Sequence, residues 1–198
     1  MAAGPARVAE RVPRSSSDGR GIVLGAIGLL LVVLLAWIVA RPAPDPAQQS
    51  ATVEGRLPAA VAGWSGQQLA NAAIVMQAGR DLGMSERDVR VAVMTAMGES
   101  SLRVIDRGDR AGPDSRGLFQ QRDPWGPYEV RMDAYGSAVL FYRALAELEG
   151  RDALPPTRVA HAVQINRDPD HYARWWDDAG AVVEAIDASD AVVVVDPA

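Results

Sequence analysis

The stretch SERDVRVAVMTAMGESSL, from Ser85 to Leu102, decides the fold class of this 198-residue chain. Its start, Ser85 to Asp88, is typical of a helix N-terminus, because a serine side chain accepts hydrogen bonds from the first backbone N–H groups of a helix. Apolar residues then recur at intervals of three and four, which predicts an α-helix with one buried face. They are Val89, Ala92, Val93, Ala96 and Met97. Glu99 falls at the C-terminal end of this helix.

Patterns of the same kind predict helices on both sides of this stretch. Ser65 to Gln68 is a candidate capping box, Asp133 is a candidate N-cap, and Asp168-Pro169 is an N-cap followed by proline at the first helical position. We expect helices at 65–83, 85–100, 133–148, 156–164 and 168–186. The valines that end at 195 are interpreted as part of a tail. The sequence therefore predicts a mainly α domain at 64–187 and a C-terminal tail at 188–198.

The N-terminal part has the features of a membrane anchor. Residues 22–40 form an uncharged apolar run with Trp37 near one end, and its length suits the hydrocarbon core of a bilayer. Four arginines precede the run, at positions 7, 11, 14 and 20. By the positive-inside rule they place the N-terminus in the cytoplasm. A cleaved signal peptide is the alternative, although its apolar region would be shorter.

These features predict the order of the segments along the chain. Residues 1–20 are read as a disordered cytoplasmic segment, 21–41 as a transmembrane helix, and 42–63 as an extracytoplasmic linker rich in proline and alanine. The predicted localisation is a single-pass membrane protein, held in the membrane by residues 22–40, whose C-terminal domain lies outside the cytoplasm.

The composition excludes several classes of function. The net charge of −5 argues against a nucleic-acid partner, because no broad basic surface is available to meet phosphates. The absence of cysteine excludes disulfides, Cys-ligated zinc and thiol catalysis, and two histidines argue against a His-rich metal centre. We therefore expect no metal and no cofactor.

Glu99 and the run from Gly117 to Gln121 are the strongest functional signals. A carboxyl that protonates a glycosidic oxygen must hold its proton near neutral pH, and both burial and a helix C-terminus raise a carboxyl pKa. The run lies in a Gly- and Pro-rich loop of a length that usually carries function. Ser115, Gln120 and Gln121 can hydrogen-bond sugar groups, or alternatively stabilise turns.

An ordered series of short motifs carries a family resemblance. The motifs are Met94 to Met97 with Glu99 to Leu102, then Gly108 to Arg110, Asp114 to Arg122, Phe141-Tyr142, Ala162 to Gln164 and Asp170 to Tyr172. With them the chain resembles the lysozyme-like domain of the soluble lytic transglycosylase and goose-type lysozyme superfamily, in the variant found in exported cell-wall proteins of high-GC Gram-positive bacteria. The resemblance runs from about Asn71 to Ile186.

The resemblance implies a helical fold around a cleft for peptidoglycan glycan strands. It implies cleavage of the β-1,4 bond between N-acetylmuramic acid and N-acetylglucosamine, with Glu99 as the catalytic acid and Gln120 in the cleft. Two positions depart from the family pattern. Ala160 to Gln164 stands where an Ala-Tyr-Asn-Ala-Gly run is usual, and Gly98 stands where a polar residue is common.

Some roles remain open at the level of the sequence. Asp106, Asp109 and Asp114 could supply a second catalytic carboxylate, or cap turns and pair with nearby arginines. The family implies that no second carboxylate is needed, because the muramic acid 6-hydroxyl attacks. Tyr142 and Tyr172 are candidates for sugar contacts, although helical aromatic residues are more often part of a core.

Two functions from different classes follow. The first is an enzyme that cleaves peptidoglycan through Glu99, as a lytic transglycosylase or a lysozyme-like glycosidase. The second is a non-catalytic peptidoglycan-binding or scaffold module, which would serve a secretion, conjugation or other complex of the cell envelope.

Overall fold

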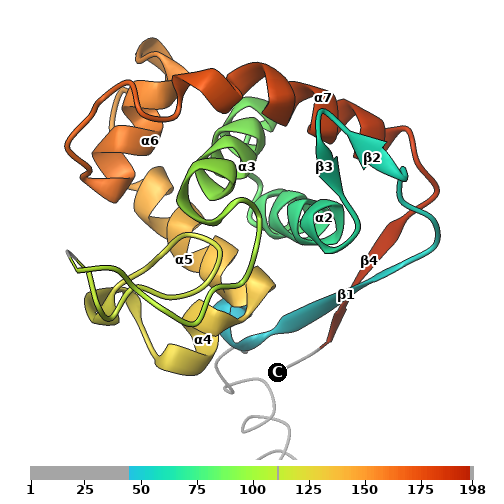
Figure 1. Ribbon diagram of the computed structural model, residues 1–198, viewed down its shortest axis with the longest axis horizontal. Coiled ribbons are helices and arrows are strands. Elements are labelled where there is room, and N and C mark those ends of the chain that lie inside the picture. The colour runs from blue at the N-terminus through green and yellow to red at the C-terminus, as the bar shows by residue number, and fades with distance from the viewer. Residues whose placement is uncertain (1–44, 111, 197–198) are drawn as a thin grey trace, which may run out of the picture. The chain divides into compact units, whose positions relative to one another are not determined.

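The computed structural model describes residues 45–110 and 112–196, and this part of the chain is mainly helical, as the sequence predicts (Figure 1). Its elements in chain order, with η for 3-10 helices, are η1 (Pro46–Gln48), β1 (Ser50–Glu54), β2 (Ala60–Val61), β3 (Trp64–Ser65), α2 (Gln67–Asp81), α3 (Glu86–Ser100), η2 (Asp123–Trp125), α4 (Tyr128–Met132), α5 (Ala134–Ala146), η3 (Arg151–Ala153), α6 (Pro156–Gln164), η4 (Ala173–Trp175), α7 (Trp176–Asp187) and β4 (Val192–Asp196).

Helix α3 lies at the centre of the helical packing. It contacts α2, α5, α6 and α7, and Figure 1 shows these helices arranged around it. Its residues from Val91 to Met97 are all buried, and all of them except Thr95 belong to one hydrophobic core with the inner faces of the surrounding helices. The stretch that decides the fold class therefore supplies the centre of the core, and it delivers Glu99 at its C-terminal end.

Two of the predicted helix starts are confirmed by their caps. Ser85 Oγ accepts a hydrogen bond from the Asp88 N–H at 3.1 Å, and Asp133 Oδ1 accepts one from the Gly136 N–H at 2.7 Å. Each satisfies a backbone donor that has no partner within its helix. The first helix differs, since its N-cap is Gly66 without a side-chain hydrogen bond.

The last helix begins later than the sequence predicts. The expected start at 168–169 is followed by a turn and by η4, and regular α-helix begins only at Trp176. This delay places Tyr172 in the irregular segment before α7, where it is fully buried.

The predicted linker at 42–63 and tail at 188–198 are corrected by the structure. Strand β1 from the linker pairs antiparallel with β4 from the tail, with Thr52 opposite Val194 and Val53 opposite Val193 (Figure 1). Alternate residues of each strand are partly buried and pack against the core, among them Val53, Val193 and Val195. The two segments therefore belong to the folded domain, because pairing satisfies their backbone groups and buries one apolar face.

The predicted localisation is also corrected. Across residues 45–110 and 112–196, no helix combines the length and the apolar character needed to cross a bilayer. The predicted transmembrane helix at 21–41 and cytoplasmic segment at 1–20 lie outside the described residues.

The β1–β4 pairing predicts a contrast between two neighbouring valines of β4. Val193→Ser removes apolar area that packs on the core and should lower the free energy of unfolding by about 1 kcal/mol, or the melting temperature by about 2–4 °C. Val194→Ser changes the exposed face and should leave both nearly unchanged. Thermal unfolding followed by circular dichroism measures the difference, and equal effects at the two positions would contradict the observed register.

Candidate active site

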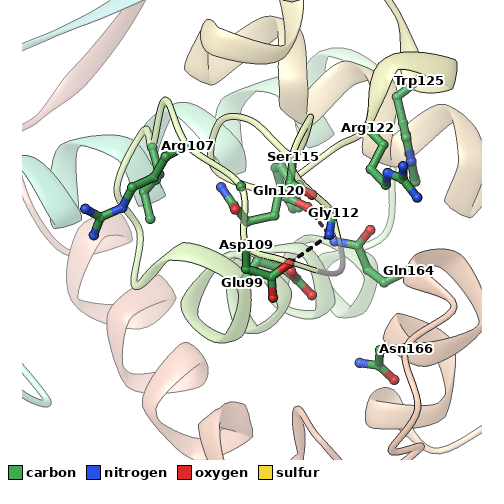
Figure 2. A pocket seen from close by; sticks show the side chains of 13 residues that line it. Glu99, Arg107, Asp109, Gly112, Ser115, Gln120, Arg122, Trp125, Gln164 and Asn166 are labelled. Carbon is green, nitrogen blue, oxygen red and sulfur yellow. Dashed lines mark hydrogen bonds between the residues drawn. The ribbon is translucent and has the colours of Figure 1, made fainter.

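A pocket of about 550 Å³ lies at the C-terminal end of α3, between α6 and the long loop that follows α3 (Figure 2). Most of its walls are polar. They are formed by Glu99, Ile105, Arg107, Gly108, Asp109, Gly112, Ser115, Phe119, Gln120, Arg122, Trp125, Gln164 and Asn166. The pocket contains the predicted acid Glu99 and Gln120, one of the two amides predicted to meet a sugar, so the two sequence signals converge in space.

Glu99 reaches the pocket because α3 ends directly after it. Ser101 and Leu102 both take left-handed backbone conformations, at φ 55° and 56°. The Leu102 N–H then bonds back to the Ala96 carbonyl at 3.1 Å, which closes the last helical turn. Leu102 is itself fully buried, and this contact fixes where the helix ends.

The Glu99 carboxyl is half-buried and holds its proton more strongly than an exposed glutamate. Burial raises its pKa, because the charged form loses hydration. The Tyr172 hydroxyl donates a hydrogen bond to Glu99 Oε1, which opposes the rise by stabilising the carboxylate. Glu99 therefore combines a raised pKa with a neighbouring hydroxyl that stabilises the carboxylate once the proton has left.

Tyr172 is positioned by the absence of a side chain at Gly98. A Cβ atom at position 98 would lie 2.7 Å from Tyr172 Cδ1, closer than real Cβ atoms approach, and 3.0 Å from Trp175 Cζ3, which is a tight contact. The glycine at position 98 thus has a local reason, because the Tyr172 ring occupies the space. Burial, reinforced by the negative Glu99, raises the pKa of the Tyr172 hydroxyl well above its usual range, so that it remains a donor.

The wall opposite α6 is held by a buried arginine. Arg131 is 4% exposed, and its guanidinium donates to the carbonyls of Asp114, Gln121 and Gly126 at 2.8, 3.0 and 2.9 Å and to the Asp123 carboxylate at 2.6 Å. These partners span the segment that carries Ser115 and Gln120. A buried guanidinium must have such partners, so the segment is tied to α4 at several points.

A tight turn aims Gln120 into the pocket. Arg116 and Gln121 form an antiparallel bridge, and within it Gln120 has a φ of 47°. The Gln120 Nε2 atom donates to the Gly117 carbonyl at 3.1 Å. Gly117 has a φ of 75°, and a Cβ there would lie 1.8 Å from the Arg131 carbonyl oxygen, so only glycine fits this position.

The predicted site residues divide into three groups: those that line the pocket, those that make internal contacts elsewhere, and Tyr172, which contacts Glu99. Glu99, Ser115 and Gln120 all line the pocket. Gln121 is 1% exposed and donates to the Ser137 carbonyl at 2.9 Å, and Tyr142 is fully buried with its hydroxyl on the Val75 carbonyl at 3.0 Å.

The substrate-binding roles predicted for Gln121 and Tyr142 are therefore corrected, because both side chains make internal contacts away from the pocket. The role predicted for Tyr172 is also corrected, since its hydroxyl contacts Glu99 and its ring is buried in the core.

The three candidates for a second catalytic carboxylate have different hydrogen-bond and ion-pair partners. Asp106 pairs with Arg116 at 2.9 Å, and Asp114 pairs with Arg122 at 2.8 Å. The Asp123 N–H and the Arg122 guanidinium lower the pKa of Asp114 to about 2. Asp109 alone of the three lines the pocket with Glu99, and its Oδ1 accepts the Gly112 N–H at 2.8 Å.

Several pocket residues lie outside the predicted set. Gln164 and Asn166 come from the end of α6 and the turn after it, and Arg107, Arg122 and Trp125 come from the long loop. Gln164 belongs to a motif that the resemblance includes, and its Nε2 donates to the Phe119 carbonyl at 2.9 Å. No comparable signal marks Asn166, because its place depends on how the chain turns after α6.

The comparisons with known proteins return nothing that names this site. No family model matches the chain, and no curated protein has a sequence that matches it. Within the described ranges, no group of three or more His, Asp or Glu side chains is placed to hold a metal ion. The chemistry of the pocket is therefore argued from its own residues.

Glu99→Gln should stabilise the fold in a pH-dependent way. Because the folded protein binds the Glu99 proton more tightly than the unfolded chain, the stability of the wild type falls as the pH rises from the unfolded pKa of about 4.3 through the raised folded pKa. The variant does not lose this stability. The difference in free energy of unfolding between variant and wild type therefore grows across that pH range and is constant above it. Urea unfolding from pH 3 to pH 8 measures the difference, with Glu149→Gln as an exposed control; a pH-independent difference would contradict the burial argument.

Gly98→Ala should raise the pKa of Glu99 further. The added methyl displaces the Tyr172 ring, so the hydrogen bond that stabilises the carboxylate weakens. Tyr172→Phe should shift the pKa in the same direction, and adding Gly98→Ala to it should cause little further change, because the shared partner is already gone. NMR titration of the Glu99 carboxyl carbon measures all three variants, and additive shifts would show that Gly98 acts by another route.

Proposed function

We propose that this protein cleaves the β-1,4 bond between N-acetylmuramic acid and N-acetylglucosamine in peptidoglycan, and that its helical domain has a lysozyme-like fold. The observation that carries the proposal is Glu99, a half-buried carboxyl with a raised pKa at the base of a polar pocket, held by the Tyr172 hydroxyl. A general acid for a glycosidic oxygen needs this combination of a retained proton and access to the bond.

Glu99 would act first as an acid and then as a base. Its proton passes to the glycosidic oxygen as the bond from that oxygen to the anomeric carbon breaks. The attacking hydroxyl then gives its proton to the Glu99 carboxylate, which restores the acid. The Tyr172 hydrogen bond to Oε1 stabilises the carboxylate between the two transfers and keeps the side chain in place.

The attacking hydroxyl that we favour is the 6-hydroxyl of the muramic acid residue, which gives an anhydro product. This choice is supported by the state of the other carboxylates. Asp106 and Asp114 are engaged in ion pairs, and Asp109 accepts a backbone N–H of its own turn. An intramolecular hydroxyl requires no second carboxylate to activate a water molecule.

The pocket walls suit an amino-sugar polymer. Amides from Gln120, Gln164 and Asn166 and the hydroxyl of Ser115 border the space beside Glu99, and Trp125 adds an aromatic surface (Figure 2). Arg107 is exposed at the same pocket and carries a charge suited to the carboxylates of peptide stems.

The test is digestion of purified peptidoglycan, with mass spectrometry of the released fragments. The wild type should release fragments with anhydro ends, and Glu99→Gln should reduce the rate by about 10²–10⁴-fold, because the variant keeps the shape and lacks the proton. The control variant Glu149→Gln makes the same substitution at an exposed position, and it should digest peptidoglycan at the wild-type rate.

Two other results would change the proposal. Hydrated ends would make water the attacking group and would turn attention to Asp109. A wild-type protein that sediments with peptidoglycan and releases no fragments would instead be a non-catalytic binding module.

A further inference from the structure

His161, Asn166 and Tyr172 form a chain of side-chain hydrogen bonds that ends at Glu99. His161 Nδ1 lies 2.6 Å from Asn166 Oδ1. The Asn166 side chain hydrogen-bonds the Tyr172 hydroxyl, which in turn donates to Glu99 Oε1. His161 lies in α6 and Asn166 in the turn after it, whereas Glu99 lies in the last turn of α3. The chain therefore reaches from α6 to the candidate acid, and the mechanism proposed above gives its two outer members no role.

The hydrogen bonds of this chain have a defined direction. A carboxamide oxygen only accepts, so His161 Nδ1 carries the hydrogen. With Oδ1 engaged, Asn166 presents Nδ2 to Tyr172, and Figure 2 shows this nitrogen on the side of the amide that faces Glu99. Burial and the negative Glu99 raise the pKa of Tyr172, and the Asn166 contact opposes the rise, as a donor to the phenolic oxygen does.

The direction matters because a hydroxyl group has a single hydrogen to donate. Asn166 Nδ2 donates to the Tyr172 oxygen, so the tyrosine hydrogen goes to Glu99 Oε1. A turned amide would present Oδ1 to the hydroxyl and would compete with Glu99 for that hydrogen. The His161 N–H opposes the turn, because it requires the amide oxygen as its acceptor.

The backbone before Asn166 is strained in a way that serves this placement. Ile165 has a φ of 53° and a ψ of 46° and is 85% exposed. A β-branched residue disfavours this left-handed conformation, and its exposed side chain gains nothing from burial. The conformation ends α6 and turns the chain back, so that Asn166 meets both His161 and Tyr172. Strained residues tend to occur where such a placement is functional.

We propose that His161 and Asn166 are positioning residues, which direct the single Tyr172 hydroxyl hydrogen onto Glu99 Oε1 and thereby leave the acid proton of Glu99 on Oε2. This inference rests on the proposed function for the use of that proton. Both residues act through Tyr172. A donor that already points at Oε1 stabilises the carboxylate as it forms, without a reorientation during proton transfer.

The experiment titrates the Glu99 carboxyl carbon by NMR in the full chain. Asn166→Ala removes both contacts of the amide, so the pKa of Glu99 should rise. The rise should be smaller than in Tyr172→Phe, where the hydroxyl itself is lost. His161→Phe keeps an aromatic ring and removes the N–H that orients the amide, and it should raise the pKa by less than Asn166→Ala does.

Two further variants at histidine positions distinguish the N–H from the ring. His161→Asn provides an amide N–H in place of the Nδ1 N–H, and it should restore the wild-type pKa of Glu99. His171→Phe is the matched control, because His171 packs edge-on against the ring of Tyr172, with centroids 4.9 Å apart, and not against its hydroxyl. This variant should leave the pKa of Glu99 near the wild-type value.

Coupling through Tyr172 separates positioning from a merely structural role. In the Tyr172→Phe background, Asn166→Ala and His161→Phe should cause no further change in the pKa of Glu99, because the hydroxyl through which they act is gone. A change in packing or in charge would still shift the pKa in that background. The other charged side chains that line the pocket are the same in every variant, and they are Arg107, Asp109 and Arg122.

Three results would overturn the inference. They are an unchanged pKa in Asn166→Ala, a shift that persists undiminished in the Tyr172→Phe background, and a His161→Asn variant that titrates like His161→Phe. None of them bears on whether Glu99 cleaves peptidoglycan.

Digestion of peptidoglycan as a function of pH tests the proposed function separately. A general acid must be protonated, so the rate should fall as the pH rises through the pKa of Glu99. In Asn166→Ala this fall should move to higher pH by the amount that NMR measures. A shift in the NMR titration with no shift in the digestion profile would contradict Glu99 as the acid and would leave the positioning chain intact.

Discussion

The hydrogen bond from Tyr172 to Glu99 is the contact on which the candidate site depends. It joins two residues 73 positions apart, one at the end of α3 and one in the irregular segment before α7. It forms only because Gly98 leaves space for the tyrosine ring. The helical packing thereby brings a donor to a half-buried carboxyl, which couples the acidity of the site to the assembly of the core.

The sequence predicts those parts of the fold that are determined locally. The caps at Ser85 and Asp133 act within three residues of themselves, and the helical period of α3 is complete within its own length. The strands were not foreseen, because β1 and β4 each have five residues and lie at opposite ends of the domain. Neither segment has a buried face until the other pairs with it, so local pattern alone suggests a linker and a tail.

The same distinction separates the site residues that the sequence identifies from those that it misses. Glu99 is placed by the end of a well-determined helix, and Gln120 by a short turn built around Gly117. Gln121 is adjacent in sequence but faces the core, since the turn sends neighbouring side chains in opposite directions. Asn166 reaches the pocket only through the left-handed backbone of Ile165, a conformation that a β-branched residue does not suggest.

A polar pocket and an acid with a raised pKa are compatible here because many of the polar groups around Glu99 are already engaged with the protein. Gln164 is bonded to the Phe119 carbonyl, Asp109 to a backbone N–H, and Arg122 to Asp114. Groups held in this way cannot turn to solvate the Glu99 carboxylate, so desolvation remains the dominant influence on its pKa. The Tyr172 hydroxyl is the fixed exception, and it acts on the charged form that proton transfer creates. The pocket thus presents polar groups to a ligand, although those groups do not solvate the Glu99 carboxylate.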